Sequence, residues 1–249
     1  MIDLQLSPLG LAAMDALGVG RGEIVLDVGC GTGQTLLQLA ERVGAGGQVI
    51  GVDIAPLLLD VARQRTQTLG QVSLFDADAQ ALDLPSTSAD AVFSRFGVMG
   101  FADPVAAFAN FARMLKPAGK LAFVCWRSPE QNELDRFPLA AAGFESAAAD
   151  TPFSFADPDH IRGTLAAAGF GDIAIWPLDQ MVSSGDVDAM SQVLSKVGPL
   201  GRILRENPAL RATAESRLRK ALAALGDPTS VELRASVWIV TARAEATTR

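Results

Sequence analysis

A nine-residue segment with three alternating glycines constrains this chain more than any other feature. Residues 25–33 read VLDVGCGTG, so a short apolar run beginning at Ile24 ends in glycines at 29, 31 and 33. Glycine adopts positive φ and lets backbone approach a ligand closely. A helix after such a loop presents its positively polarised N-terminus to that ligand. The order strand, glycine loop and helix therefore predicts a nucleotide-type binding site.

The glycine spacing argues against two common nucleotide-binding loops. A dinucleotide loop follows G-x-G-x-x-G, and counting from Gly29 and Gly31 its third glycine position holds Gln34. A P-loop needs Gly-Lys-Ser/Thr where the helix starts, and no lysine lies near this loop. The remaining pattern, D-x-G-x-G-x-G from Asp27, resembles the first motif of the class I S-adenosylmethionine (SAM) dependent methyltransferases. A purely structural tight turn is the alternative.

The second predicted strand, residues 48–53, ends in an acid. Asp53 comes about 20 residues after the glycine loop, the spacing at which a carboxylate reaches a ribose diol. The resemblance implies that Asp53 accepts hydrogen bonds from both ribose hydroxyls. Since Ile54-Ala55-Pro56 opens a helix with proline near its first turn, a helix-capping role is the alternative, and both roles can hold.

A third predicted strand, residues 72–75, leads into Asp76 and Asp78. The resemblance implies that Asp78 accepts from the adenine amino group and that the backbone of Ala79 binds the ring edge, whereas Asp76 is the less favoured acid. The full set of residues expected to bind the cofactor is Asp27, Gly29, Gly31, Gly33, Asp53, Ile54, Asp78, Ala79 and Ser94.

Strands alternate with helical stretches over residues 23–126, which predicts βαβ units and a parallel sheet. Further strands are expected at 89–94, 120–126, 170–176 and 231–242, with helices at 7–17, 104–115 and 159–168. The resemblance implies an α/β fold: a Rossmann-like, mostly parallel seven-stranded sheet with an antiparallel final strand pair and helices on both faces. In such sheets ligands gather at the carboxyl ends of the strands, where all the acids above lie.

One domain is expected over residues 1–249, with a SAM-binding core at 20–127 and substrate-covering insertions at 128–156 and 185–226. The second insertion has apolar residues at helical spacing and is broken at Gly198-Pro199. We interpret it as a helical lid; additional core on the flank of the sheet is the alternative.

Composition favours a globular protein and argues against a nucleic-acid partner. The chain is 49% hydrophobic and 20% charged, and its formal charge of −7 argues against a nucleic-acid partner. Cys30 and Cys125 are too few for a disulfide framework or a metal cluster, so we expect no metal and a cytoplasmic location. No apolar run reaches membrane-spanning length. A monomer or homodimer is expected.

Few side chains offer acid–base chemistry, since the chain has no tyrosine and one histidine. Methyl transfer from a sulfonium needs mainly alignment, and a base only if the nucleophile arrives protonated. His160, Glu133 and Asp135 are weak candidates for that base, and a surface or capping role for His160 is favoured over it. Arg95 could pair with a substrate carboxylate or phosphate; a salt bridge to a strand-end acid is the alternative.

The resemblance is strongest to the small-molecule branch related to ubiquinone and menaquinone biosynthesis. It implies SAM-dependent methyl transfer, with S-adenosylhomocysteine (SAH) as the second product, to a small and largely apolar metabolite. A protein that binds SAM without methylating remains the alternative. A dinucleotide reductase is disfavoured by Gln34, and a protein or nucleic-acid methyltransferase by the acidic charge and by Ser94-Arg-Phe-Gly after the fourth strand.

Overall fold

The computed structural model describes residues 2–144 and 153–245. Contacts between residues divide the chain into two compact units. The sheet unit comprises 9–125, 154–177 and the chain from 238, and the helical unit comprises the chain to residue 8, 126–153 and 178–237. The predicted core at 20–127 lies almost wholly in the sheet unit, and the described parts of both predicted insertions lie mainly in the helical unit.

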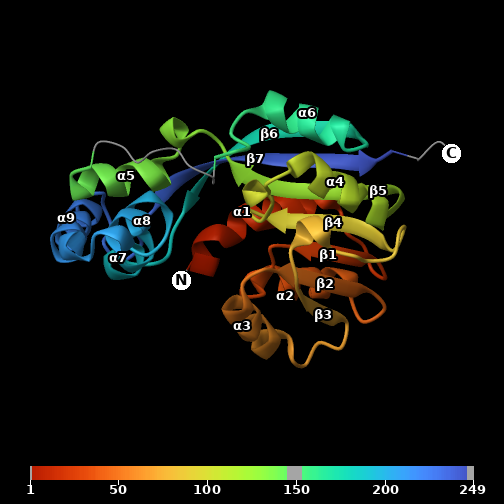
Figure 1. Cartoon of the computed structure of the whole chain (residues 1–249). Helices are drawn as coiled ribbons and strands as arrows, with labels where there is room; N and C mark the ends of the chain where they lie inside the picture. The colour runs from red at the N-terminus through yellow and green to blue at the C-terminus, as the bar shows by residue number, and fades with distance from the viewer. Residues whose placement is uncertain (1, 145–152, 246–249) are drawn as a thin grey trace. The chain divides into compact units, whose positions relative to one another are not determined.

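The predicted seven-stranded, mostly parallel α/β sheet is confirmed: six strands run parallel to one another, and the last strand of the chain pairs antiparallel. The spatial order is β3-β2-β1-β4-β5-β7-β6 (Figure 1). The strands are β1 (Ile24–Val28), β2 (Gln48–Asp53), β3 (Val72–Asp76), β4 (Ala89–Arg95), β5 (Leu115–Trp126), β6 (Phe170–Val182) and β7 (Leu233–Ala244).

The register of the parallel strands brings the predicted acids to one edge. Asp27 of β1 lies opposite Gly51 of β2 and Phe93 of β4, while Asp53 at the end of β2 lies opposite Asp76. Because these strands are parallel and the paired residues lie near their carboxyl ends, the loops after β1, β2, β3 and β4 lie at the same end of the sheet.

Helices flank this sheet because their apolar faces are buried on it. Each of α2 (Gln34–Val43), α3 (Pro56–Thr66), α4 (Pro104–Met114) and α6 (Pro158–Ala167) follows a strand or loop of the sheet unit, and α2 packs on α3 while α4 packs on α6. Proline occupies the first turn of α3, α4 and α6, where its missing N–H costs no intrahelical bond. Short 3₁₀ turns, η1 (Ala79–Ala81) and η2 (Val98–Gly100), follow β3 and β4.

Phenylalanines form the centre of the sheet unit. Phe108 of α4 has its ring centroid 5.6 Å from Phe123 of β5, 6.0 Å from Phe155 and 6.4 Å from Phe170 of β6. All four rings are buried. This core fixes α4 on the sheet, and with it the loop that enters α4 at the edge where the strands end.

The helical unit contains α5 (Glu133–Ala142), α7 (Val187–Leu194), α8 (Gly198–Glu206) and α9 (Arg211–Ala223), with η3 (Pro129–Gln131) and η4 (Pro208–Leu210) between them. The predicted break at Gly198-Pro199 is confirmed as the start of α8. Helix α5 packs on α8 and α9, and α7 packs on α8 and α9. Val193, Leu194, Leu200 and Leu204 are buried, so helix–helix packing accounts for most of the apolar pattern read from the sequence.

Three predicted boundaries were wrong. Helix α1 spans Ile2–Leu17 and begins five residues before Ser7, with Pro8 inside it. Strand β6 continues past Trp176 through Pro177 to Val182, which an edge strand tolerates because one side of its ladder has no partner. Strand β5 begins at Leu115 and so includes residues 116–119, which were expected to lie between the helix at 104–115 and the strand at 120–126. Among the described residues, none of these helices has the length and apolarity to span a bilayer.

Candidate functional site

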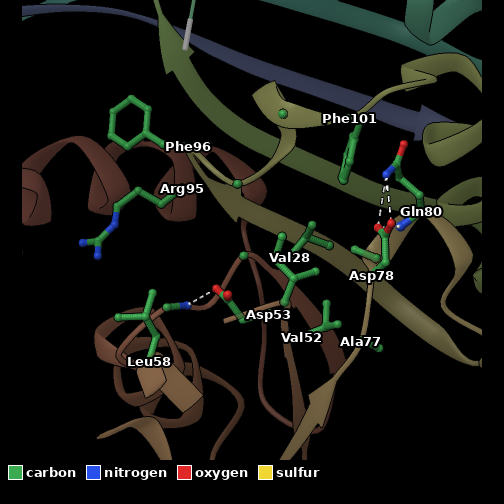
Figure 2. A pocket seen from close by; sticks show the side chains of 16 residues that line it. Val28, Val52, Asp53, Leu58, Ala77, Asp78, Gln80, Arg95, Phe96 and Phe101 are labelled. Carbon is green, nitrogen blue, oxygen red and sulfur yellow. Dashed lines mark hydrogen bonds between the residues drawn. The ribbon is translucent and has the colours of Figure 1, made fainter. Parts of the chain in front are cut away.

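A cavity of about 370 Å³ lies where β1, β2, β3 and β4 end (Figure 2). Seven of the residues selected from the sequence line it: Gly29, Gly31, Asp53, Ile54, Asp78, Ala79 and Arg95. All belong to the sheet unit. The topology therefore brings together the loops after four strands, although their lining residues are spread over residues 28–101 of the chain.

Asp53 is held at the cavity by two backbone donors. Its Oδ2 accepts from the N–H of Gly31 at 2.8 Å (Figure 2), and its Oδ1 accepts from the N–H of Ala55 at 2.9 Å. The second bond lies in the turn that leads into α3, whose N-cap residue is Ala55 and which has no side-chain capping hydrogen bond. A carboxylate accepts about four hydrogen bonds, so Asp53 keeps lone pairs for a ligand. The alternative role of Asp53 as the side-chain cap of α3 is not seen.

The glycine loop is built by close backbone approach. Gly29 has φ +72°, and a Cβ there would lie 2.7 Å from the Cα of Gly97, so the loops after β1 and β4 touch. A Cβ on Gly31, φ +54°, would meet nothing within 4 Å. Gly33 does not line the cavity; a Cβ there would lie 3.0 Å from the side chain of Ala62 on α3.

Asp27 lies behind the loop with a fully buried carboxyl. Its Oδ2 accepts from the Thr35 hydroxyl at 2.5 Å, and its Oδ1 is buried without a hydrogen-bond partner in the described part of the chain. Burial raises the pKa of Asp27 to about 7, against the opposing effects of the Thr35 hydrogen bond and the Arg95 charge. A buried polar atom without a partner is rare in folded proteins, so a donor from a ligand would suit it.

Asp78 caps the turn that follows β3. Its Oδ1 accepts from the backbone N–H of Gln80 at 2.9 Å, and the Gln80 side chain donates to Oδ1 and Oδ2 at 3.2 and 3.0 Å (Figure 2). Phe101 lines the cavity in the same region. An acid beside an aromatic side chain is a suitable environment for a purine carrying an exocyclic amine.

Arg95 lines the opposite part of the cavity, at the end of β4. Its Nη1 donates to Oε1 of Gln34, the first residue of α2, and its charge acts on buried Asp27. Ser94, just before it, does not line the cavity. Its hydroxyl donates to the carbonyl of Val28 at 2.8 Å and accepts from the N–H of Gly97 at 3.1 Å, so it joins the ends of β1 and β4.

The weak candidates for a catalytic base lie elsewhere. His160 is exposed on α6 and stacks on Phe155, with ring centroids 5.7 Å apart. Glu133 and Asp135 belong to the helical unit; Glu133 Oε2 accepts from the N–H of Arg234 at 2.9 Å, and burial raises the pKa of Asp135 to about 6. Within the described residues no cluster of acids, histidines and cysteines could hold a metal ion.

Several lining residues were not identified from the sequence. They are Val28, Val52, Leu58, Ala77, Gln80, Phe96, Gly97, Gly100 and Phe101. Phe96 has φ +62°, a conformation uncommon for residues other than glycine, and such outliers often accompany functional sites. Phe101 precedes Asp103, which caps α4, so its position just before a predicted helix start was the available signal.

Comparison with known proteins defines the family. Residues 26–123 match the model of a methyltransferase domain. Demethylmenaquinone methyltransferase of Staphylococcus epidermidis is 31% identical over 180 residues, which cover 65% of this chain and 73% of that protein. The chain belongs to the SAM-dependent methyltransferase family. SAM is accordingly its cofactor, as the glycine motif predicted.

Other relatives of this methyltransferase agree with that assignment. Aklanonic acid methyltransferase DauC of Streptomyces sp. strain C5 is 38% identical over 119 residues, 47% of this chain, and the match spans only about half (54%) of DauC. The crystal structure of the YcgJ protein from Bacillus subtilis superposes with a TM-score of 0.65 at 17% identity, covering 96% of this chain and 98% of that one. At this low identity the last likeness shows the fold alone.

Proposed function

We propose that this chain transfers the methyl group of SAM to a small, largely apolar metabolite and releases SAH. The observation that carries the proposal is the arrangement of Asp53, Asp78 and the glycine loop around one cavity at the strand ends. In this proposal Asp53 takes the ribose hydroxyls, Asp78 and the backbone of Ala79 take the adenine edge, and the side chains of Ile54, Leu58 and Phe101 cover the purine.

The amino-acid end of SAM would then lie against Gly29 and Gly31, where no side chain intrudes. Two groups support this direction: the charged Arg95 beside Gln34, and the buried carboxyl of Asp27 behind the loop, whose Oδ1 has no partner among the described residues. A zwitterionic ligand end offers one carboxylate and one ammonium group to match them. The sequence suggested a substrate anion for Arg95, and its bond to the first residue of α2 favours the cofactor instead.

Catalysis in this proposal comes mainly from positioning. Only Asp53, Asp78 and Arg95 carry ionisable side chains among the residues lining the cavity, and each has a binding role above. Holding nucleophile, methyl carbon and sulfur in line can supply roughly 7–11 kcal/mol.

The apolar substrate is supported by the relatives. Their names give demethylmenaquinone and aklanonic acid as substrates of those enzymes. The buried apolar residues of α7 and α8 are not evidence for an apolar substrate, because they pack against neighbouring helices. We retain the substrate-covering role of residues 128–156 and 185–226 as part of the proposal; residues 145–152 lie outside the described part of the chain.

Transfer of a labelled methyl group tests the function. The purified protein is first examined by native mass spectrometry for retained SAM, SAH or apolar metabolite, then incubated with trideuteromethyl SAM and a panel of quinones and aromatic polyketides. We expect a mass gain of one labelled methyl group on one acceptor class. The alternative of SAM binding without methylation predicts bound SAM and no labelled acceptor.

A matched pair of glycine variants tests whether the cavity is the site of transfer. Gly31→Val places a side chain in the open cavity and should abolish both SAM binding and transfer. Gly18→Val changes an exposed glycine that also has a positive φ, +61°, and no neighbour within 4 Å, so it introduces the same backbone strain away from the cavity and should leave both intact. Equal activity of the two variants would contradict the placement of SAM.

A further inference from the structure

The side-chain amide of Gln80, a half-buried residue of η1, takes part in four hydrogen bonds. Its Nε2 donates to both carboxylate oxygens of Asp78, at 3.2 and 3.0 Å. Its Oε1 accepts from the backbone N–H groups of Ala102 and Asp103, at 2.9 and 3.2 Å. One amide therefore connects the turn after β3 with the residues that lead into α4.

These contacts fix which way the amide faces. The oxygen meets two N–H donors and the nitrogen meets a carboxylate, so a flipped amide would oppose donor to donor and acceptor to acceptor. Together with its backbone N–H, Gln80 directs two donors at Asp78. These donors hold the Asp78 carboxyl in one orientation, with lone pairs remaining for a donor from the cavity.

The same amide places the wall beside Asp78. Ala102 and Asp103 follow Phe101, which lines the cavity, and Asp103 caps α4 through Ala106. From α4, Asn110 braces the turn without touching Asp78: its Nδ2 donates to the carbonyls of Leu82 at 2.9 Å and Gln80 at 3.4 Å. The side chains of Gln80 and Asn110 therefore both hold this turn, but only Gln80 also orients Asp78.

We infer that Gln80 is the positioning residue for base selectivity, holding Asp78 so that it accepts a hydrogen bond from an exocyclic purine amine. This inference rests on the proposed placement of SAM. A purine with a carbonyl oxygen at that position presents an acceptor to an acceptor and is disfavoured. Selectivity for adenine over hypoxanthine therefore depends on a residue that need not contact the base.

The test compares the affinities of SAH and its deaminated analogue S-inosylhomocysteine by calorimetry. Gln80→Glu keeps the shape and the oxygen that accepts from Ala102 and Asp103, and replaces the donor to Asp78 by a second carboxylate. Gln80→Met removes both interactions. In both variants we expect the preference for SAH to fall by about tenfold or more, the size of one lost charge-assisted hydrogen bond.

Asn110→Leu is the matched control, because it loosens the same turn while leaving the Gln80–Asp78 pair in place. It should weaken binding of both ligands by the same factor and preserve the preference. A full preference for SAH in both Gln80 variants would overturn the inference, as would a loss of preference in Asn110→Leu equal to theirs. Failure of the wild-type protein to bind SAH would instead refute the proposed function.

Discussion

The carboxyl of Asp27 is the most unusual single group in the sheet unit, because it is fully buried and bonded on only one oxygen. Its pKa of about 7 in the folded protein lies above the ordinary value of 3.8. Between these two pH values the folded state keeps a proton that the unfolded state has released. Stability therefore falls as pH rises through this window.

This pH dependence is measurable. In the ligand-free protein, the difference in unfolding free energy between wild type and Asp27→Asn should change by about 2 kcal/mol between pH 5 and pH 7, to the disadvantage of the wild type at pH 7. Urea unfolding at a series of pH values provides the measurement. Parallel pH profiles for the two proteins would show that Asp27 does not titrate in this range.

At the scale of secondary structure, the sequence predicts the bounds of the first two strands more closely than the bounds of α1 and β6. β1 and β2 match their predicted bounds because a buried apolar run ends in glycine or aspartate at each. The start of α1 and the end of β6 were misjudged at Pro8 and Pro177, where the surrounding structure tolerates a missing N–H. Gln80 and Phe101 were missed because their role depends on which loops meet in space.

One of the first residues of β5 has an unfavourable backbone conformation. Ala118 has φ +60°, in the left-handed region where a Cβ is disfavoured. Ala118→Gly should raise the unfolding free energy by about 0.5–1 kcal/mol, after allowing for the greater freedom of glycine in the unfolded chain.

A second alanine gives the control of opposite sign. Ala166 is exposed in α6, where glycine lowers helix stability by up to about 1 kcal/mol. Thermal unfolding of Ala118→Gly and Ala166→Gly should therefore shift in opposite directions. A loss of stability in Ala118→Gly would mean that the positive φ carries no strain.

For the whole molecule, the division into two units places the proposed cofactor site within one of them. Every residue lining the cavity belongs to the sheet unit. The helical unit has its own core, in which α5 packs with α8 and α9, so excising residues 186–226 would leave α5 without its partners. Point substitutions in that core are therefore the sharper test of its role.

Leu218 of α9 is fully buried and provides such a substitution. Leu218→Ala should destabilise the helical unit by about 2–5 kcal/mol and lower methyl transfer while leaving SAH affinity unchanged. Leu39→Ala, at a fully buried position of α2 in the sheet unit, should weaken SAH binding as well. Calorimetry and the labelled-methyl assay measure both. Reduced SAH affinity in a folded Leu218→Ala variant would argue against the separation.

Isothermal titration of SAH into wild type and Asp53→Ala tests the central claim most directly. The proposal gives Asp53 a charge-assisted pair of bonds to the ribose, each worth about 1.5–3 kcal/mol. The variant should therefore bind SAH at least tens-fold more weakly while circular dichroism shows the fold retained. Unchanged SAH affinity in folded Asp53→Ala would contradict the assignment of this cavity as the cofactor site.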